Sequence, residues 1–319
     1  MALISQDATI PLNLFKTSPK SIIIKGNQNM SGKNTPVVAV LNMKGGVGKT
    51  TIAGNLFREV FHDKQIHTLL IDLDAQFNLT QLLKTRVQYD NLLADQKTIF
   101  SVFQHKIPDS VFAVSEEYHL ELPPIDNLVT TLEKIDNTDA KLQLLSGDFR
   151  LTMLNLKTGA ELRLPKKRFK RFVESAKQQY QLVIIDCNPS TSFLTSCALE
   201  VASHLLIPVK PDKYSVIGVE MILDYTKGYL EKGLVPAINI LLNDMKDESD
   251  DKDVASGLRK HRELGSKVLV NELKHSKLLR AKPDHTGFAT EQKVPYNETV
   301  RKNLVEIAKE YYPFLGLSL

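Results

Sequence analysis

The stretch KGGVGKTT at residues 44–51 indicates what kind of protein this chain encodes. A β-branched apolar run at residues 37–41 precedes it, and a stretch of helical character follows it from Thr50. Between a strand and a helix, the three glycines let backbone N–H groups converge on phosphate oxygens, because no Cβ atom obstructs the approach. The N-terminus of the helix adds partial positive charge at the same point. The stretch therefore predicts a phosphate-binding loop.

The polar side chains of this loop fit the same chemistry. Lys49 would reach the β- and γ-phosphates, and the Thr50 hydroxyl would ligate Mg²⁺. Met43 stands where the commonest pattern, G-x-x-x-x-G-K-[ST], has its first glycine, and Lys44 is a second lysine. This variant is the deviant Walker A signature, K-G-G-x-G-K-[ST]. The residues predicted to bind the nucleotide phosphates are Gly45, Gly46, Val47, Gly48, Lys49, Thr50 and Thr51.

The composition is that of an ordinary globular protein. The chain has 319 residues, of which 24% are charged and 42% hydrophobic, and this length allows one large or two ordinary domains. No apolar run approaches the roughly 18 residues of a membrane span, and the N-terminus lacks the plan of a secretory signal. Two cysteines make no disulfide framework. We therefore expect a reducing cytoplasm.

Strand-like apolar runs alternate with helical stretches along most of the chain. The strands are predicted at residues 37–41, 67–73, 142–145, 182–185, 204–209, 235–242 and 267–270. The helices are predicted at residues 50–61, 165–180, 193–201, 215–231, 254–264 and 297–312. Strands separated by helices run parallel, so we expect an α/β fold: a mostly parallel, twisted sheet with helices on both faces, of the P-loop NTPase type. Residues 85–140 give no clear pattern.

The domain boundary is expected near residue 36. Residues 1–35 mix Ser, Asn, Gly, Pro and Lys, and we interpret them as an N-terminal extension, flexible in composition and too short for a domain with its own core. No linker of flexible composition divides residues 36–319. They are therefore predicted to form one ATPase domain.

Three segments together resemble the ParA/MinD family of deviant Walker A ATPases, and ParA-type partition ATPases most closely. Besides the loop, LLIDLDAQ at residues 69–76 is similar to the family's D-x-D-x-Q switch segment. LVIIDCNPS at residues 182–190 is similar to its Walker B strand and second switch. The resemblance runs through residues 37–83 and 180–242. It implies ATP and Mg²⁺ as cofactors and hydrolysis of ATP to ADP and phosphate.

The acidic residues after two strands complete the expected site. Asp186 ends an apolar strand and would hold Mg²⁺, through water. The resemblance implies that Asp74 positions the attacking water and that Asp72 contributes to the outer shell of the metal. Asn243, at the end of the 235–242 strand, is expected to contact adenine, although an Asn there is also a common turn residue. Phe77 departs from the family, whose D-P-Q-G-N pattern has glycine at this position.

Lys44 has no evident task within its own subunit, since Lys49 already serves the phosphates. The resemblance implies that Lys44 crosses a two-fold interface to the partner's nucleotide, so that ATP favours a homodimer and hydrolysis loosens it. It also implies non-specific binding of double-stranded DNA, a ParB-like adaptor that stimulates hydrolysis, and segregation of plasmid or chromosomal DNA. The protein would then be nucleoid-associated in the cytoplasm of a bacterium or archaeon.

The basic residues are concentrated in the C-terminal part of the chain. Residues 251–310 hold 13 Lys and Arg against nine Asp and Glu, an excess equal to the whole net charge of +4. Such clusters neutralise DNA phosphates without reading sequence. The candidate DNA-contacting residues are Lys277, Arg280, Lys282, Arg301 and Lys302. A second basic run, residues 166–171, is either a further DNA contact or a solvated helix face.

Other functions are known on the same fold. A MinD-like ATPase would end in a basic amphipathic helix, whereas YYPFLGLSL at the end of this chain is apolar and interrupted by Pro313, so no stable membrane anchor is expected. An iron–sulfur ATPase needs paired cysteine ligands, which Cys187 and Cys197 do not offer; Cys187 is expected to be a small buried side chain. A synthetase of this fold usually lacks Lys44. An ATPase that positions a protein assembly would use the same residues and remains the alternative.

Overall fold

The central sheet has seven strands in the order β3-β4-β2-β5-β1-β6-β7. The computed structural model describes residues 35–104, 120–212, 214–230, 236–246, 248–280 and 285–318. The strands are β1 (Val37–Val40), β2 (Thr68–Asp72), β3 (Thr130–Lys134), β4 (Lys141–Leu145), β5 (Leu182–Asp186), β6 (His204–Val209) and β7 (Ala237–Leu242). The extension expected over residues 1–35 lies outside the described residues, except for Thr35.

All neighbouring strands are parallel except β3, which pairs antiparallel with β4 at one edge. The central strands β1, β2 and β5 are buried along their whole length, as expected of parallel strands covered on both faces. Their continuous apolar sequence, VVAV in β1 and LVII in β5, follows from that burial. The predicted mostly parallel α/β sheet is confirmed.

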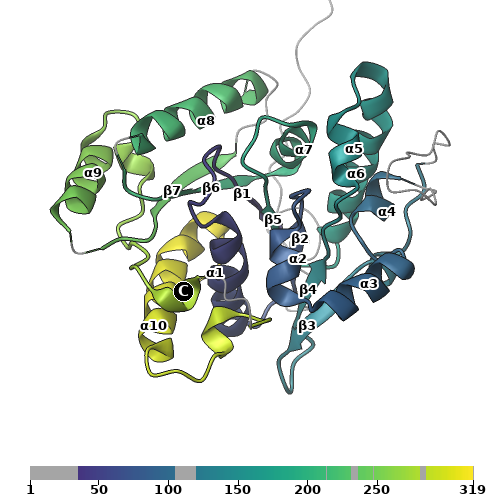
Figure 1. Ribbon diagram of the computed structural model, residues 1–319, viewed down its shortest axis with the longest axis horizontal. Helices are drawn as coiled ribbons and strands as arrows, with labels where there is room; N and C mark the ends of the chain where they lie inside the picture. The colour runs from purple at the N-terminus through teal and green to yellow at the C-terminus, as the bar shows by residue number, and fades with distance from the viewer. Residues whose placement is uncertain are drawn as a thin grey trace, which may run out of the picture. The chain divides into compact units, whose positions relative to one another are not determined.

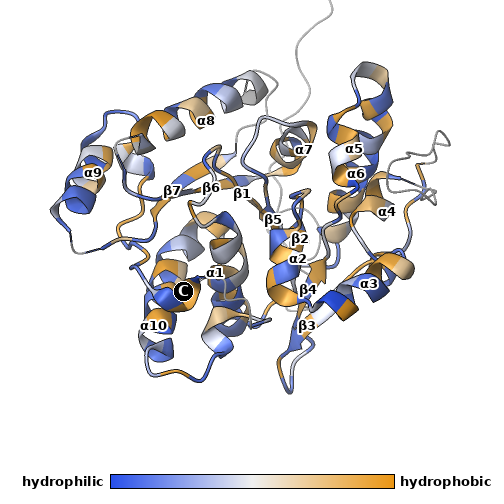
Figure 2. Ribbon diagram, in the orientation of Figure 1, coloured by the Kyte–Doolittle hydropathy of each residue, from blue (hydrophilic) through white to orange (hydrophobic). Residues whose placement is uncertain are grey.

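Helices cover both faces of the sheet (Figure 1). They are α1 (Lys49–Lys64), α2 (Asn78–Leu83), α3 (Arg86–Ala94), α4 (Phe100–Phe103), α5 (Leu151–Asn155), α6 (Arg163–Ala176), α7 (Phe193–Val201), α8 (Ser215–Leu230), α9 (Ser249–Lys260) and α10 (Asn297–Tyr311). Helices α1 and α10 lie together on one face, and α6, α7 and α8 lie on the other (Figure 1). Hydrophobic and hydrophilic residues alternate along these helices (Figure 2), and the apolar ones pack with residues of the sheet. Each face thus has its own buried apolar cluster.

The apolar stripe of the last helix forms as its spacing predicts. Val300, Leu304, Ile307, Ala308 and Tyr311 are all buried on α10. The ring of Tyr311 meets Phe57 of α1 edge to face, with ring centroids 6.3 Å apart. This helix therefore closes the core on the face of α1, and the chain end is part of the domain.

In the C-terminal third, one predicted strand is absent and one predicted helix has other bounds. Residues 267–270 form no strand: a 3₁₀ turn occupies Gly265–Lys267, and Val268 makes only an isolated bridge to Ile240. The helix expected over residues 254–264 is α9, which begins earlier, at Ser249, and ends at Lys260. Asp250 and Asp251 lie in its first turn, where the helix dipole stabilises carboxylates. These two acidic residues therefore favour the start of α9 at this point.

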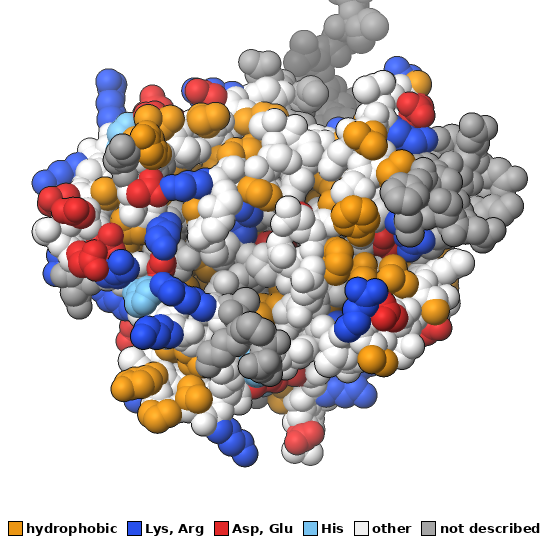
Figure 3. Space-filling view, viewed as in Figure 1, with side chains coloured by type: hydrophobic (Ala, Val, Ile, Leu, Met, Phe, Trp, Pro, Cys, Tyr) orange, Lys and Arg blue, Asp and Glu red, His pale blue; other side chains and the backbone are white. Residues whose placement is uncertain are grey.

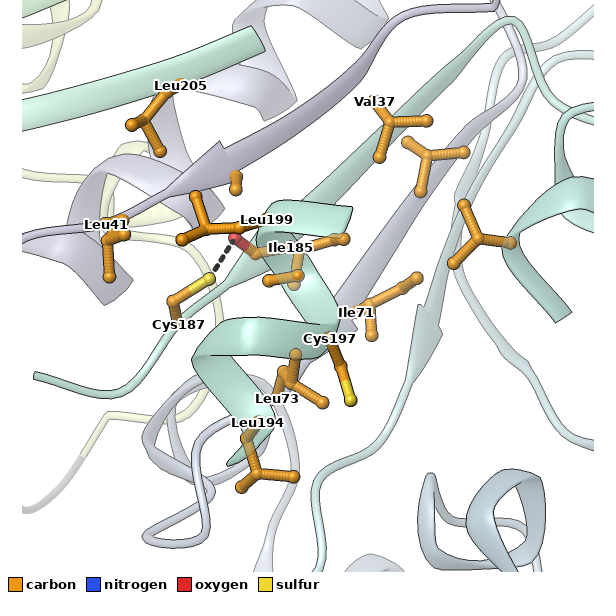
Figure 4. Packing of buried hydrophobic residues seen from close by; sticks show 14 of the residues in the cluster. Val37, Leu41, Ile71, Leu73, Ile185, Cys187, Leu194, Cys197, Leu199 and Leu205 are labelled. Atoms are coloured by element: carbon orange, nitrogen blue, oxygen red, sulfur yellow. Dashed lines mark hydrogen bonds between the residues drawn. The ribbon is translucent and has the colours of Figure 1, made fainter. Parts of the chain in front are cut away.

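The two cysteines are buried side chains in the core (Figure 4). Cys187 directly follows β5, and its thiol donates to the carbonyl oxygen of Ile185 over 3.7 Å. Burial raises the pKa of both thiols above the ordinary value. Cys187 is thus the small buried cysteine that its position predicts.

The residues of the basic run at 166–171 have different environments: Lys167 and Arg171 are exposed, whereas Arg168 is buried. Arg168 is buried on α6, and its guanidinium donates to the carbonyl oxygens of Val102, at 2.8 Å, and Ser101, at 3.2 Å. Lys166 and Lys170 both pair with Glu200. Arg168 therefore belongs to the packing between α4 and α6, because buried carbonyl groups need donors.

The antiparallel edge strand is attached to α1 through Glu133. This carboxylate accepts from Arg58 Nε at 2.5 Å and contacts His62 Nε2 at 2.6 Å. Burial alone would raise the pKa of Glu133, but the hydrogen bonds from His62 and Arg58 outweigh it and lower the pKa. The folded state therefore favours the ionised carboxylate.

This contact predicts a pH dependence of stability. A carboxylate whose pKa is lowered by folding stabilises the fold above the unfolded pKa, about 4.3, and the contribution is lost as the pH falls through the folded pKa. Glu133→Gln should therefore be less stable than the parent at pH 7, and the difference should shrink towards pH 3. Urea unfolding across this range measures it. Glu161→Gln, at an i,i+4 ion pair with Lys157 in which the carboxylate is exposed, is the control. If the difference in free energy of unfolding between Glu133→Gln and the parent is the same at every pH, the assignment is contradicted.

Candidate nucleotide-binding site

The carboxyl ends of the central strands bring the predicted site residues together. The loop of residues 44–51 follows β1, Asp186 ends β5, and Asp72 ends β2. Asp186 is the register partner of Val40 on one side and of Asp72 on the other. Asn243 follows β7. Neighbouring parallel strands end at the same edge of a sheet, so residues far apart in sequence meet at one point.

The loop after β1 has the backbone conformation that its glycines allow. Gly46 and Gly48 have φ values of 73° and 89°, a region that strongly favours glycine. A methyl group at Gly48 would also lie only 2.2 Å from Asn243 Nδ2. That amide donates to the carbonyl oxygen of Val47 over 2.8 Å. Asn243 therefore braces the loop, a role that the sequence did not suggest, and its contact with adenine stays a prediction.

Lys49 and Thr50 begin α1 at the rim of the loop. Lys49 Nζ donates to the carbonyl oxygen of Lys44 over 3.0 Å. Burial lowers the pKa of Lys49, and the nearby carboxylate of Asp186 opposes this. The Thr50 hydroxyl donates to Asp186 Oδ2 over 2.7 Å. The two side chains predicted to meet phosphate and Mg²⁺ thus converge with the acid that ends β5.

The two strand-end acids are buried side by side. Asp72 Oδ2 accepts from both the backbone N–H and the hydroxyl of Thr80, each at 2.7 Å. Burial, with a contribution from Asp74, raises the pKa of Asp72 to about 7, although the bonds from Thr80 oppose it. Burial also raises the pKa of Asp186 well above its ordinary value, and the charges of Asp72 and Asp74 add to this. The site therefore has an excess of negative charge that a cation would neutralise.

The donor set fits a magnesium ion bound with a nucleotide. Asp186 Oδ1 is buried and has no hydrogen-bond partner among the described residues, and the Thr50 hydroxyl lies beside the same carboxylate. Mg²⁺ prefers oxygen ligands, keeps several waters and commonly shares its shell with phosphates. In the part of the chain that is described, no three His, Cys, Asp or Glu side chains form a metal cage. Thr50 and Asp186 would therefore hold the ion together with phosphate and water.

A cavity of 730 Å³ opens at this edge of the sheet, within the size range of small-ligand sites. One wall contains Gly45, Gly46, Gly48, Lys49 and Thr50, and Asp74 and Gln76 lie on another. Asp74 is almost fully buried, and its Oδ1 accepts from the backbone N–H of Gln76 over 2.9 Å. A smaller hollow of 310 Å³ adjoins the loop, lined by Asn243, Asp244, Lys210 and Arg280 among others.

Lys44 differs from Lys49 in its surroundings. Its side chain is 43% exposed, forms an ion pair with Asp212, and does not line the cavity. Asp212 lies just before α8. The two lysines of the loop therefore have different environments: Lys49 lines the cavity, and Lys44 lies at the surface.

The candidate DNA-contacting residues have different environments. Arg280 lines both hollows beside the loop, and Lys277 is exposed. Arg301 Nε donates to Glu59 Oε2 of α1 over 2.9 Å, and Lys302 pairs with Glu298 at the surface. Lys282 lies outside the described residues. Figure 3 shows Lys and Arg side chains interspersed with Asp and Glu on the side of α9.

Comparison with known proteins identifies relatives of this chain. Residues 35–240 match a family described as AAA domain. A ParA family protein from Chlamydia muridarum is 30% identical over 210 residues, covering 65% of this chain and 71% of that protein. The sporulation initiation inhibitor protein Soj from Bacillus subtilis is 30% identical over 194 residues, 59% of this chain and 63% of Soj.

Solved structures share the fold at lower identity. A plasmid partition protein from Borrelia burgdorferi, bound to AMPPNP, is 18% identical with a TM-score of 0.62, and the match covers 86% of this chain and 98% of that one. Cobyrinic acid a,c-diamide synthase from Mycobacterium smegmatis, with an ATP analogue and magnesium, is 22% identical with a TM-score of 0.60, covering 86% and 93%. A partition protein and a synthetase thus have the same architecture, so this likeness carries the fold alone.

The ion pair between Arg301 and Glu59 predicts a loss of stability that a DNA contact would not. Glu59 is 1% exposed, and its other cation, Arg58, lies 3.7 Å from Oε1. Arg301→Ala would remove the charged hydrogen-bond donor to Oε2 of this buried carboxylate and should lower the free energy of unfolding by about 1–3 kcal/mol. Lys302→Ala, at an exposed pair, should change it by less than about 0.5 kcal/mol. Urea unfolding without DNA compares the two variants. Equal stabilities would refute a structural role for Arg301.

Proposed function

The chain belongs to the ParA family of P-loop ATPases, and on that premise we propose that it is a DNA-partition ATPase. ATP bound at the loop of residues 44–51 brings two copies together, and the dimer binds double-stranded DNA non-specifically. A ParB-like adaptor on the transported DNA stimulates hydrolysis and releases the dimer. The observation that carries this proposal is the contrast between the two loop lysines, with Lys49 in the cavity and Lys44 exposed outside it.

Nucleotide binding rests on the residues around the cavity. Backbone N–H groups at the loop and at the start of α1 donate hydrogen bonds to the phosphates. The ammonium group of Lys49 then pairs with the phosphates in place of the Asp186 carboxylate. Thr50 and Asp186 would hold Mg²⁺, which neutralises the phosphate oxygens when bound. Asp72 would act from the outer shell, since both its oxygens already accept bonds from Thr80 and from the backbone N–H of Asp74. Asn243 would contact the adenine from the adjoining hollow.

Hydrolysis rests on Asp74. Its carboxylate lines the cavity with Lys49 and Thr50, and one of its oxygens is oriented by the N–H of Gln76. The other oxygen is then available to accept a hydrogen bond from the attacking water. Phosphoryl transfer depends mainly on positioning and charge neutralisation, so one oriented carboxylate gives slow hydrolysis that an adaptor can raise.

Dimerisation rests on Lys44. Its ammonium group pairs with Asp212 at the surface, and an exposed ion pair of this kind contributes little free energy. The polyphosphate of a second subunit offers more negative charge than one carboxylate. Two ATP molecules between two subunits would therefore draw both Lys44 side chains across the interface, and loss of the γ-phosphates would weaken it.

DNA binding is proposed for the basic residues of the C-terminal part. The candidates are Lys277, Arg280, Lys282, Arg301 and Lys302. Among the described ones, Lys277 and Lys302 are exposed, whereas Arg280 borders the nucleotide cavity and Arg301 pairs with the buried Glu59. None of the described helices has the length and apolar character to cross a membrane. The proposed place of action is the nucleoid in the cytoplasm of a bacterium or archaeon.

The role of Lys44 can be tested by substituting each lysine in turn. Lys49→Ala should abolish ATP binding, because the phosphates lose their cation in the cavity. Lys44→Ala should bind ATP and Mg²⁺ as the parent does but sediment as a monomer. Calorimetry measures the binding, and analytical ultracentrifugation with ATP measures the mass. A Lys44→Ala protein that forms the ATP dimer would refute the crossing lysine.

DNA binding should depend on both ATP and salt. With ATP and Mg²⁺ the parent should bind an arbitrary duplex, and affinity should fall steeply between 50 and 200 mM salt, by roughly 0.9 log unit per log unit of salt for each phosphate contacted. Fluorescence anisotropy with two unrelated duplexes checks the affinity and its indifference to sequence. Lys44→Ala serves as the control that binds ATP without dimerising. No affinity at low salt would contradict the partition function.

A further inference from the structure

Phe77 has a backbone conformation that aromatic residues rarely adopt. Its φ of 44° and ψ of 40° lie in the left-handed region, where the Cβ atom of an L-residue is crowded against the backbone. In the family pattern that this switch segment resembles, glycine stands at this position, and glycine takes this conformation without a steric penalty. The surrounding structure must therefore hold Phe77 in place.

The conformation of Phe77 sets the turn that presents Asp74. The backbone N–H of Phe77 donates to the carbonyl oxygen of Asp74 over 2.8 Å, and the N–H of Gln76 donates to Asp74 Oδ1 over 2.9 Å. Phe77 is also the N-cap residue of α2, and its carbonyl accepts from Gln81. The chain path from Asp74 into α2 thus passes through the φ and ψ angles of Phe77.

Two neighbours enclose the Phe77 side chain. Its ring stacks on Tyr89 of α3, with centroids 4.8 Å apart and an interplanar angle of 11°. Tyr89 itself is only 7% exposed. On another side, a methyl group at Gly147 would lie 2.7 Å from Phe77 Cβ and 2.8 Å from Asp72 Cγ. The absence of a side chain at Gly147 therefore leaves room for Phe77 Cβ and for the carboxyl group of Asp72.

We propose that Phe77 is a positioning residue for ATP hydrolysis. Its stack on Tyr89 holds the strained turn in the conformation that directs Asp74 into the cavity beside Lys49. The inference rests on the proposed function, because it takes Asp74 as the group that orients the attacking water. Phe77 itself does not line the cavity, so its effect falls on the rate of hydrolysis and not on the affinity for ATP.

Single-turnover hydrolysis by the full chain with ATP and Mg²⁺ tests the stack. Tyr89→Leu removes the aromatic ring but retains apolar volume, and the rate should fall about two- to ten-fold, the range that corresponds to an aromatic pair. The dissociation constant for ATP should change by less than about two-fold, because the loop is untouched. Tyr89→Phe keeps the ring and should retain the parent rate. A folded Tyr89→Leu protein with the parent rate overturns the proposal.

The same stack can be tested from its other side. Phe77→Ala should lose rate as Tyr89→Leu does, and Phe77→Tyr, which keeps a ring, should not. The double variant Phe77→Ala with Tyr89→Leu should be no slower than the slower single variant, because one contact is removed twice. Amide exchange at Gln76 and Phe77 should speed up in both single variants. The proposal is overturned if the rate losses of the two single variants multiply in the double variant. It is also overturned if the amide protons of Gln76 and Phe77 exchange as slowly in the single variants as in the parent.

Asp74→Asn separates this inference from the function on which it rests. If Asp74→Asn hydrolyses ATP at the parent rate, the assigned role of Asp74 fails, and the positioning role fails with it. If Asp74→Asn binds ATP but loses hydrolysis while the Tyr89 and Phe77 variants keep the parent rate, only the positioning role is overturned. Loss in all three, with ATP binding retained, supports both.

Discussion

Two carboxyl groups buried side by side at the ends of β2 and β5 govern the organisation of this protein. Asp72 and Asp186 are register partners, and both are withdrawn from water. Withdrawal from water and mutual repulsion each disfavour the ionised forms, so the pKa of both groups is raised. A sheet would not keep such a pair without compensating groups. Thr80 and Lys49 provide part of the compensation in the protein, and a bound cation would provide the rest.

The same pair of acids joins segments that belong to different parts of the chain. Asp186 accepts from Thr50 at the start of α1, and Asp72 accepts from Thr80 in α2. The Thr80 hydroxyl in turn accepts from the backbone N–H of Gly147, after β4, over 2.7 Å. The nucleotide loop, the switch turn and the chain after β4 are therefore connected through two side chains and one hydroxyl. This pair of acids thus contacts both α2 and the turn that contains Asp74.

The sequence predicted those parts of the structure whose causes are local. The loop of residues 44–51 and the strands β1, β5 and β6 combine a strong pattern with a fixed position, and they fold as expected. β3 was missed because TTLEK at an edge is only half-buried and carries little apolar signal. Residues 267–270 have the composition of a strand, yet the backbone after the 3₁₀ turn allows only one bridge to β7. Pairing partners, and not composition, decide such segments.

Charged residues were harder to interpret, because the partner of a charge is set by the tertiary structure. Arg168 and Arg301 look alike in sequence, each within a basic cluster, but one serves buried carbonyl groups and the other a buried carboxylate. The environment of Phe77, beside the site, is likewise set by the tertiary structure. The sequence shows only that Phe77 departs from the family's glycine. Its contacts depend on Tyr89 and on the absence of a side chain at Gly147. An aromatic residue in this left-handed conformation needs tertiary contacts to offset its backbone strain, and the stack on Tyr89 provides one at the turn that contains Asp74.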